Sequence, residues 1–157
     1  MEPPALQSDA WLLRGISSIP GELRLRKGVL SFRAEFFGNA WPFQLRRLEH
    51  VLALPGLAAS LDEGEPRVLF KWPVGEVKAW CPWYYFGGGL KLRRGSVTLR
   101  FSLGRPANAQ VNLGSSAPPL ALPQAAENLG EVRRMRREGA RWLAALAEVK
   151  QGSGRPA

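Results

Sequence analysis

Two arms of alternating apolar and charged residues flank the dipeptide Lys27-Gly28, and this pattern is the strongest constraint on the fold. Leu23 and Leu25 alternate with charged residues before the dipeptide, and Leu30 and Phe32 resume the alternation after it. Successive side chains of a strand point to opposite faces, so a period of two predicts strands that are buried on one face only. We therefore expect an antiparallel hairpin in a sheet that has one solvated face.

Other short segments between Pro and Gly residues have strand-like composition. Three of these segments are predicted to be strands, namely 67–72, 76–81 and 95–103. Of the three, 95–103 has the most regular alternation of apolar and polar residues. The segment 41–45 is interpreted as a further strand, with Trp41, Phe43 and Leu45 on one face. The run 48–54 could be one helical turn or a strand; a short turn followed by a strand at 50–54 is favoured, and a loop at 56–66 is expected after it.

The C-terminal part of the chain changes from a period of two to a helical period. Pro, Gly, Ser and Ala residues mark 104–124 as a linker, and a helix is predicted over about 125–150. Trp142 is expected to flank the apolar stripe of this helix, which consists of Leu129, Val132, Met135, Gly139, Leu143, Leu146 and Val149. Such a stripe can pack against a sheet.

These elements predict one domain over residues 11–150, with flexible tails at 1–10 and 151–157. The 157 residues are enough for a single core. The expected fold is mainly β: a bent antiparallel sheet or partly open barrel of six to seven strands, capped by one long C-terminal helix. A lipocalin-like or OB-like barrel is the competing architecture.

This order of elements resembles the PH-like superfold, and in particular its GRAM-like branch. The resemblance rests on the hairpin Gly21–Phe32, on Trp41–Val51, and on the last strand with the helix. It implies a module that binds acidic lipids or phosphoinositides in some members and proteins in many. The segments 104–124 and Gly87-Gly88-Gly89 depart from the usual pattern of the family.

The scarcity of Asp, His and Cys argues against catalysis and against a metal site. Only Asp9 and Asp62 are aspartates, and His50 and Cys81 are the one histidine and the one cysteine. Hydrolases and phosphoryl-transfer enzymes need carboxylates that converge on a water, a metal or a nucleophile. Cys81 is expected to be structural. No catalytic residue, metal or cofactor is predicted, and an enzyme acting on an anionic substrate ranks third among the hypotheses.

The net charge of +9 favours an anionic partner, although a GC-rich genome also explains much of the arginine excess. Two clusters at predicted loop ends are the candidate anion-binding or lipid-binding residues: Arg24, Arg26 and Lys27 in the hairpin, and Lys91, Arg93 and Arg94 after the glycines. A basic helix face is predicted from the spacing of Arg133, Arg137 and Arg141. A solvated, purely structural role is an alternative for these cations.

An aromatic run lies just before the three glycines. The residues Trp83, Tyr84, Tyr85 and Phe86 are a candidate binding loop, which would insert into a membrane interface, stack on nucleic-acid bases or contact a peptide. The favoured alternative is that these rings fill the core.

The predicted function is therefore a non-enzymatic PH/GRAM-like module that recognises an anionic membrane surface or a protein partner. Nucleic-acid binding through basic and aromatic residues is the second hypothesis. No apolar run reaches the length of a membrane span, and no secretory signal is recognised. The expected location is the cytoplasm, with peripheral membrane attachment left open; the sequence does not indicate an oligomeric state.

Overall fold

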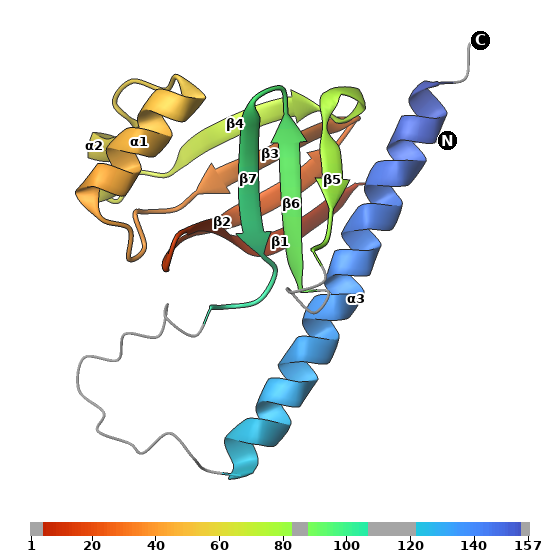
Figure 1. Ribbon diagram of the computed structural model, residues 1–157. Coiled ribbons are helices and arrows are strands. Elements are labelled where there is room, and N and C mark those ends of the chain that lie inside the picture. Colours follow the sequence, from red (N-terminus) through yellow and green to blue (C-terminus); the bar gives the residue numbers. More distant parts are fainter. Residues whose placement is uncertain (1–4, 83–87, 107–121, 155–157) are drawn as a thin grey trace.

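The computed structural model describes residues 5–82, 88–106 and 122–154, with the side chains of the last range described from residue 129. Seven antiparallel strands form one open sheet in the order β4-β3-β2-β1-β7-β6-β5. The strands are β1 Leu6–Arg14, β2 Ser17–Arg26, β3 Val29–Ala34, β4 Arg67–Pro73, β5 Lys78–Trp80, β6 Gly89–Arg94 and β7 Val97–Ser102. Figure 1 shows β5, β6 and β7 lying across β1–β4, with the long helix α3 (Leu122–Ser153) beside β5 and β6.

The predicted hairpin is confirmed. Lys27 and Gly28 have φ angles of 50° and 74°, the left-handed conformation that a tight hairpin turn requires. Across β2 and β3, Leu23 pairs with Phe32 and Leu25 pairs with Leu30. All four of these apolar side chains are fully buried, so the period of two assigned one face of the hairpin to the core.

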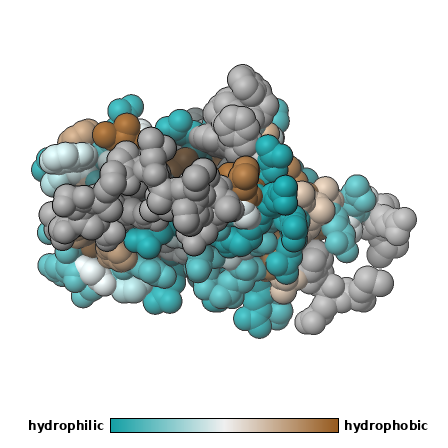
Figure 2. Space-filling model, turned by 90° about the horizontal axis from the view of Figure 1, so that it is seen from below, coloured by the Kyte–Doolittle hydropathy of each residue, from teal (hydrophilic) through white to brown (hydrophobic). Residues whose placement is uncertain are grey.

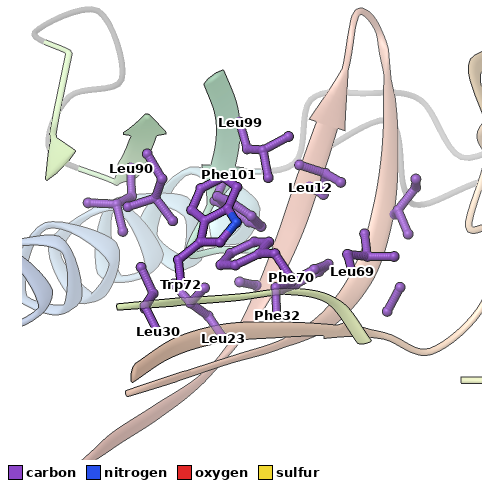
Figure 3. Packing of buried hydrophobic residues seen from close by; sticks show 14 of the residues in the cluster. Leu12, Leu23, Leu30, Phe32, Leu69, Phe70, Trp72, Leu90, Leu99 and Phe101 are labelled. Carbon is purple, nitrogen blue, oxygen red and sulfur yellow. The ribbon is translucent and has the colours of Figure 1, made fainter. Parts of the chain in front are cut away.

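Aromatic side chains from both halves of the bent sheet meet in this core. Phe70 and Trp72 of β4 stack with their ring centroids 4.2 Å apart, and Phe32 meets Phe101 of β7 edge-on at 4.9 Å. Figure 3 shows these rings pointing toward one another, with leucines of β1, β6 and β7 around them. Edge-on and offset pairs of this kind add to the free energy gained by burying the rings.

The predicted fold class, mainly β with one long C-terminal helix, is confirmed. The sheet is not closed, because β4 and β5 remain its two edges; a closed barrel is therefore not formed. The helix α3 extends beyond the predicted 125–150 at both ends: it begins inside the predicted linker and ends at Ser153, so the predicted C-terminal tail is wrong for residues 151–153. The remainder of that linker, 107–121, lies outside the described residues.

Trp142 is the main anchor of α3, whereas the sequence pattern placed it beside the apolar stripe. Its side chain is fully buried, and Leu146 and Val149 of the same helix are also buried. Its Nε1 donates a hydrogen bond of 2.9 Å to Ser8 Oγ on β1, and the Ser8 hydroxyl donates in turn to Glu138. The indole N–H is thus satisfied inside the core, which a buried tryptophan requires.

The first part of the predicted stripe does not reach the sheet. Leu129 is 62% exposed and Val132 is 37% exposed. Met135 is the first stripe residue in close contact with the β-structure, because it lies against the backbone of Gly88 and Gly104. The stripe prediction is therefore right only from Met135 onward.

The N-terminal tail prediction is wrong from Leu6 onward. β1 begins at Leu6 and pairs with β2 along its whole length, from Leu6 opposite Leu25 to Arg14 opposite Ser17. Burial alternates only in part along β1, which has half-buried residues on its second face. This mixed pattern hides the strand from a search for strict alternation.

The predicted strands at 41–45 and 50–54 are also wrong, since this part of the chain is the helix α1 (Pro42–Leu52). Trp41 and Phe43 are exposed, and it is Leu45 and Leu48, one helical turn apart, that are buried. Pro42 lies in the first turn of α1, where backbone N–H groups have no acceptor within the helix. The absence of an N–H in proline therefore costs no helical hydrogen bond there.

The expected loop at 56–66 contains a second short helix, α2 (Leu57–Asp62). Leu57 and Leu61 are fully buried at a spacing of one turn. Both short helices were missed for the same reason: each buries only two residues on one face, and so gives a weak helical period.

The remaining predicted strands are largely confirmed. The segment 67–72 covers β4 except for its last residue, Pro73, and the segment 95–103 contains β7. The segment 76–81 is shortened to β5, because the 3₁₀ helix η1 (Val74–Glu76) precedes it.

The outer surface is mainly hydrophilic in the view of Figure 2, with smaller apolar areas between the polar ones.

The contact between Met135 and the two glycines yields a test of how α3 is held. A Cβ at Gly104 would lie 2.6 Å from Met135 Cγ, so Gly104→Ala forces the Met135 side chain or the backbone around it to move. We expect a loss of about 1–3 kcal/mol in the free energy of unfolding, measured by urea denaturation. Met135→Ala in the same chain should recover part of that loss.

Gly130→Ala is the matched control, because this glycine lies in α3 with no neighbouring atom within 4 Å of its would-be Cβ. It should stabilise the protein by about 0.5–1 kcal/mol through helix propensity alone. Equal stability of Gly104→Ala and the unmodified protein would contradict the proposed docking of Met135.

Candidate anion-binding site

Three arginines from distant parts of the chain surround one pocket of about 300 Å³. Arg14 comes from the end of β1, Arg47 from the middle of α1 and Arg100 from β7. The rest of the lining is apolar or uncharged: Leu13, Gly15, Phe43, Gln44 and Thr98. A guanidinium presents up to five N–H donors in a fixed planar fork, so three of them can surround one compact anion.

Gln44 joins the two chain segments that form this pocket. Its Nε2 donates a 2.9 Å hydrogen bond to the carbonyl oxygen of Arg14, and its Oε1 accepts one of 2.9 Å from the backbone N–H of Trp41. The side chain of one helix residue therefore holds the end of β1 and the start of α1 together. Gly15, with φ of 61°, turns the chain at this point toward β2.

The positive charge of the pocket has no neutralising partner among the described carboxylates. Within the part of the chain that the structure describes, no carboxylate pairs with any of the three arginines. The pKa of Arg14 is lowered from its ordinary value, first by burial and then by repulsion from Arg47 and Arg100. A lowered pKa means that the charged form of Arg14 is less favourable in the folded chain than in the unfolded chain.

The predicted hairpin cations lie at the other end of the sheet. β2 starts at the arginine pocket and ends at Arg26, roughly 30 Å away for a strand of this length. Arg24 and Arg26 line a cavity of about 490 Å³ with Leu6 and Gln7. Arg24, however, pairs with Glu22 at 2.7 Å, which reduces its attraction for an external anion. Lys27 is exposed at the turn.

The second predicted cluster is engaged in local contacts. Arg94 forms an ion pair of 2.5 Å with Glu76, and Arg93 Nε donates to the carbonyl oxygen of Gly95. Lys91 Nζ lies 6.0 Å from the ring centroid of Trp80, a cation–π distance. The aromatic residues Trp83, Tyr84, Tyr85 and Phe86 lie outside the described residues, so their predicted role stays a prediction.

The basic helix face is present and exposed to solvent. Arg133, Arg137 and Arg141 are all exposed, and Arg141 lies 3.8 Å from a carboxylate oxygen of Glu138. No pocket among those described collects these side chains. The face therefore resembles a solvated helix surface, and it serves below as a control for net charge.

The residues with nucleophilic or metal-binding chemistry lie apart from one another. Cys81 is half-buried, and its Sγ is 3.8 Å from the carbonyl oxygen of Pro82. His50 is exposed on α1. In the described ranges, no group of three or more His, Cys, Asp or Glu side chains is placed to hold a metal ion.

The arginine pocket was not predicted from the sequence. Arg14, Arg47 and Arg100 are far apart along the chain, and none belongs to a cluster except for the neighbour Arg46. Only the pairing of β1 with β7 and the packing of α1 bring them together. No local sequence signal identifies such a site.

A comparison of the chain with protein-family models, curated proteins and solved structures finds no match. Across the described residues, none of the helices combines the length and apolar character needed to cross a membrane.

Repulsion among the three arginines predicts a gain in stability when one of them is removed. Arg100→Gln should raise the free energy of unfolding by about 0.3–1 kcal/mol at low ionic strength. The gain should shrink at high salt, where the repulsion is screened. Urea denaturation at two salt concentrations measures both effects.

Arg33→Gln serves as the control, since Arg33 lies opposite Glu22 across β2 and β3. Its removal should leave stability unchanged or lower it slightly. A loss of stability in Arg100→Gln at low salt would show that Arg100 has a stabilising partner instead.

Proposed function

We propose that this protein is a non-enzymatic binding module that recognises an anionic membrane surface through Arg14, Arg47 and Arg100. Three arginines that pair with no described carboxylate converge on one pocket, and this convergence carries the proposal. The three arginines repel one another in the folded chain, and no described carboxylate offsets this repulsion. An external anion bound in the pocket would therefore reduce the repulsion.

The chemistry of the pocket favours binding over catalysis. Its polar lining besides the arginines is the amide of Gln44 and the hydroxyl of Thr98. Neither group acts as a general base at neutral pH without an activating partner. Arginine side chains supply hydrogen bonds and charge rather than proton transfer.

The proposed PH/GRAM-like type of the module rests on the order of its elements, in which antiparallel strands are followed by one long helix. The strand order places β1 beside both β2 and β7, and α3 packs along the opposite side of the sheet from α1, as Figure 1 shows. The helix occupies one end of the bent sheet, and the arginine pocket lies where β1 ends, at the other end. A ligand can therefore approach the pocket without displacing α3.

A membrane surface fits this pocket better than a nucleic acid does. A cavity of about 300 Å³ accommodates one compact anionic group, such as a lipid phosphate. A nucleic-acid strand needs a longer basic track with stacking rings along it. The rings predicted for that role, Trp83 to Phe86, lie outside the described residues. Nucleic-acid binding remains the alternative.

Vesicle co-sedimentation tests the proposal with vesicles of phosphatidylcholine alone and with added phosphatidylserine. The unmodified protein should bind the anionic vesicles and leave the neutral ones. The variant Arg14→Gln, Arg47→Gln, Arg100→Gln should bind them about 100-fold more weakly, if each arginine contributes about 1 kcal/mol.

The matched control is Arg133→Gln, Arg137→Gln, Arg141→Gln, which removes the same charge from α3. It should retain most of the binding. Equal losses in the two triple variants would show that only net charge matters, and equal recovery with neutral and anionic vesicles would refute the proposal. Binding of single-stranded DNA, measured by fluorescence anisotropy at physiological salt and lost in the first variant, would favour the alternative.

A further inference from the structure

Three large apolar side chains stand in solvent around the arginine pocket. Ile16 is 81% exposed, Phe43 is 61% exposed and Trp41 is 59% exposed. Phe43 lines the pocket itself, and Ile16 follows Gly15, which also lines it. Exposed apolar groups that gather around one site mark an interaction surface, whereas scattered ones need no explanation.

These side chains, termed here the apolar rim, occupy protruding positions. Ile16 lies in the tight turn between β1 and β2, where the chain reverses at the end of the sheet. Trp41 and Phe43 lie at the start of α1. Figure 1 shows α1 on the side of the molecule away from α3, so the rim is clear of the helix that covers the other end.

The rim is held together by the same residue that shapes the pocket. Gln44 bonds to the backbone of Arg14 on one side and to the backbone of Trp41 on the other. One amide group therefore links the backbone of Arg14, two residues before Ile16, to the backbone of Trp41. A preformed surface loses little conformational entropy when it binds.

The exposed apolar surface of the rim continues along α1, with an arginine between its apolar residues. Phe43, Arg47 and Val51 follow one another at intervals of four residues, which places them on one face of the helix. Phe43 and Val51 are exposed on that face, on either side of a pocket arginine. Apolar residues and cations thus alternate over a short distance on one surface.

We infer that Ile16, Trp41 and Phe43 insert into the hydrocarbon edge of an anionic bilayer while the adjacent arginines bind its lipid phosphates; this inference rests on the proposed function. A bilayer places phosphates at its surface, a headgroup region that favours aromatic rings below them, and hydrocarbon deeper still. Arginines, an aromatic ring and apolar side chains on one surface match these three layers. Charge complementarity to the anionic leaflet identifies the occupant.

The shape of the rim also favours a bilayer over a protein partner. The centre of a protein–protein interface is depleted of charged residues and closely packed. Here the arginines are central, and the apolar side chains protrude from a turn and a helix start around them. A fluid lipid surface adapts to separate protrusions of this kind.

Monolayer penetration tests the inference, with the full chain injected under films of phosphatidylcholine alone and with phosphatidylserine. Ile16→Ser with Trp41→Ser removes two exposed rim side chains that do not line the arginine pocket, and Leu129→Ser removes an apolar side chain of similar exposure from α3. We expect the unmodified protein and Leu129→Ser to raise the surface pressure of the anionic film, and the rim variant to leave it nearly unchanged.

Vesicle binding by the same proteins separates insertion from electrostatic attraction. At low salt the rim variant should still bind anionic vesicles through its arginines. At high salt its binding should fall at least about tenfold below that of the unmodified protein, since burying one such side chain corresponds to about a factor of ten in partition.

Each outcome is decisive. Equal penetration by the rim variant and the unmodified protein overturns the rim while leaving the arginine site in place. Penetration of neutral and anionic films alike, lost in the rim variant, supports the rim and refutes anionic recognition. If the unmodified protein causes no rise in surface pressure, the inferred insertion of the apolar rim is overturned. Circular dichroism and the urea midpoint confirm that each variant is folded.

Discussion

The docking of α3 onto the bent sheet is the interaction on which the rest of the structure depends. An open sheet with seven strands has an apolar interior that one element must cover. Trp142 does so with its ring fully buried and its N–H bonded to Ser8 on β1. Met135 then packs against the backbone of Gly88 and Gly104, where any side chain would collide with it. The helix is thereby fixed both at its middle and along β6.

Because α3 covers one end of the sheet, the other end is left for a different kind of surface. There α1 packs on the end of β1, and Gln44 holds the two together. The strands that position the aromatic core also position Arg14 and Arg100, since core and surface residues alternate along β7. The same backbone therefore supplies stability on one face and positive charge on the other.

Under the proposed function, the arginine pocket would give up some stability of the fold in return for anion binding. Burial first, and then repulsion from Arg47 and Arg100, lower the pKa of Arg14, so the charged form of Arg14 disfavours the folded state. Folding tolerates this because the core, with its stacked Phe70 and Trp72, provides a much larger favourable term. An anion at the pocket would remove the repulsion, and the adjacent apolar rim would add to the binding without adding charge.

The sequence by itself determined the features that depend on neighbours in the chain. Alternation around Lys27-Gly28 fixed the hairpin, and the long helical period fixed the existence of α3, because both signals arise from the local geometry of a strand and a helix. Short helices such as α1 and α2 bury two residues each, so their period was too weak to distinguish from strands. The choice of Trp142 as anchor and the meeting of Arg14, Arg47 and Arg100 were decided only by tertiary structure. Those contacts join residues dozens of positions apart, and their energies depend on strand pairing and helix packing that no local pattern encodes.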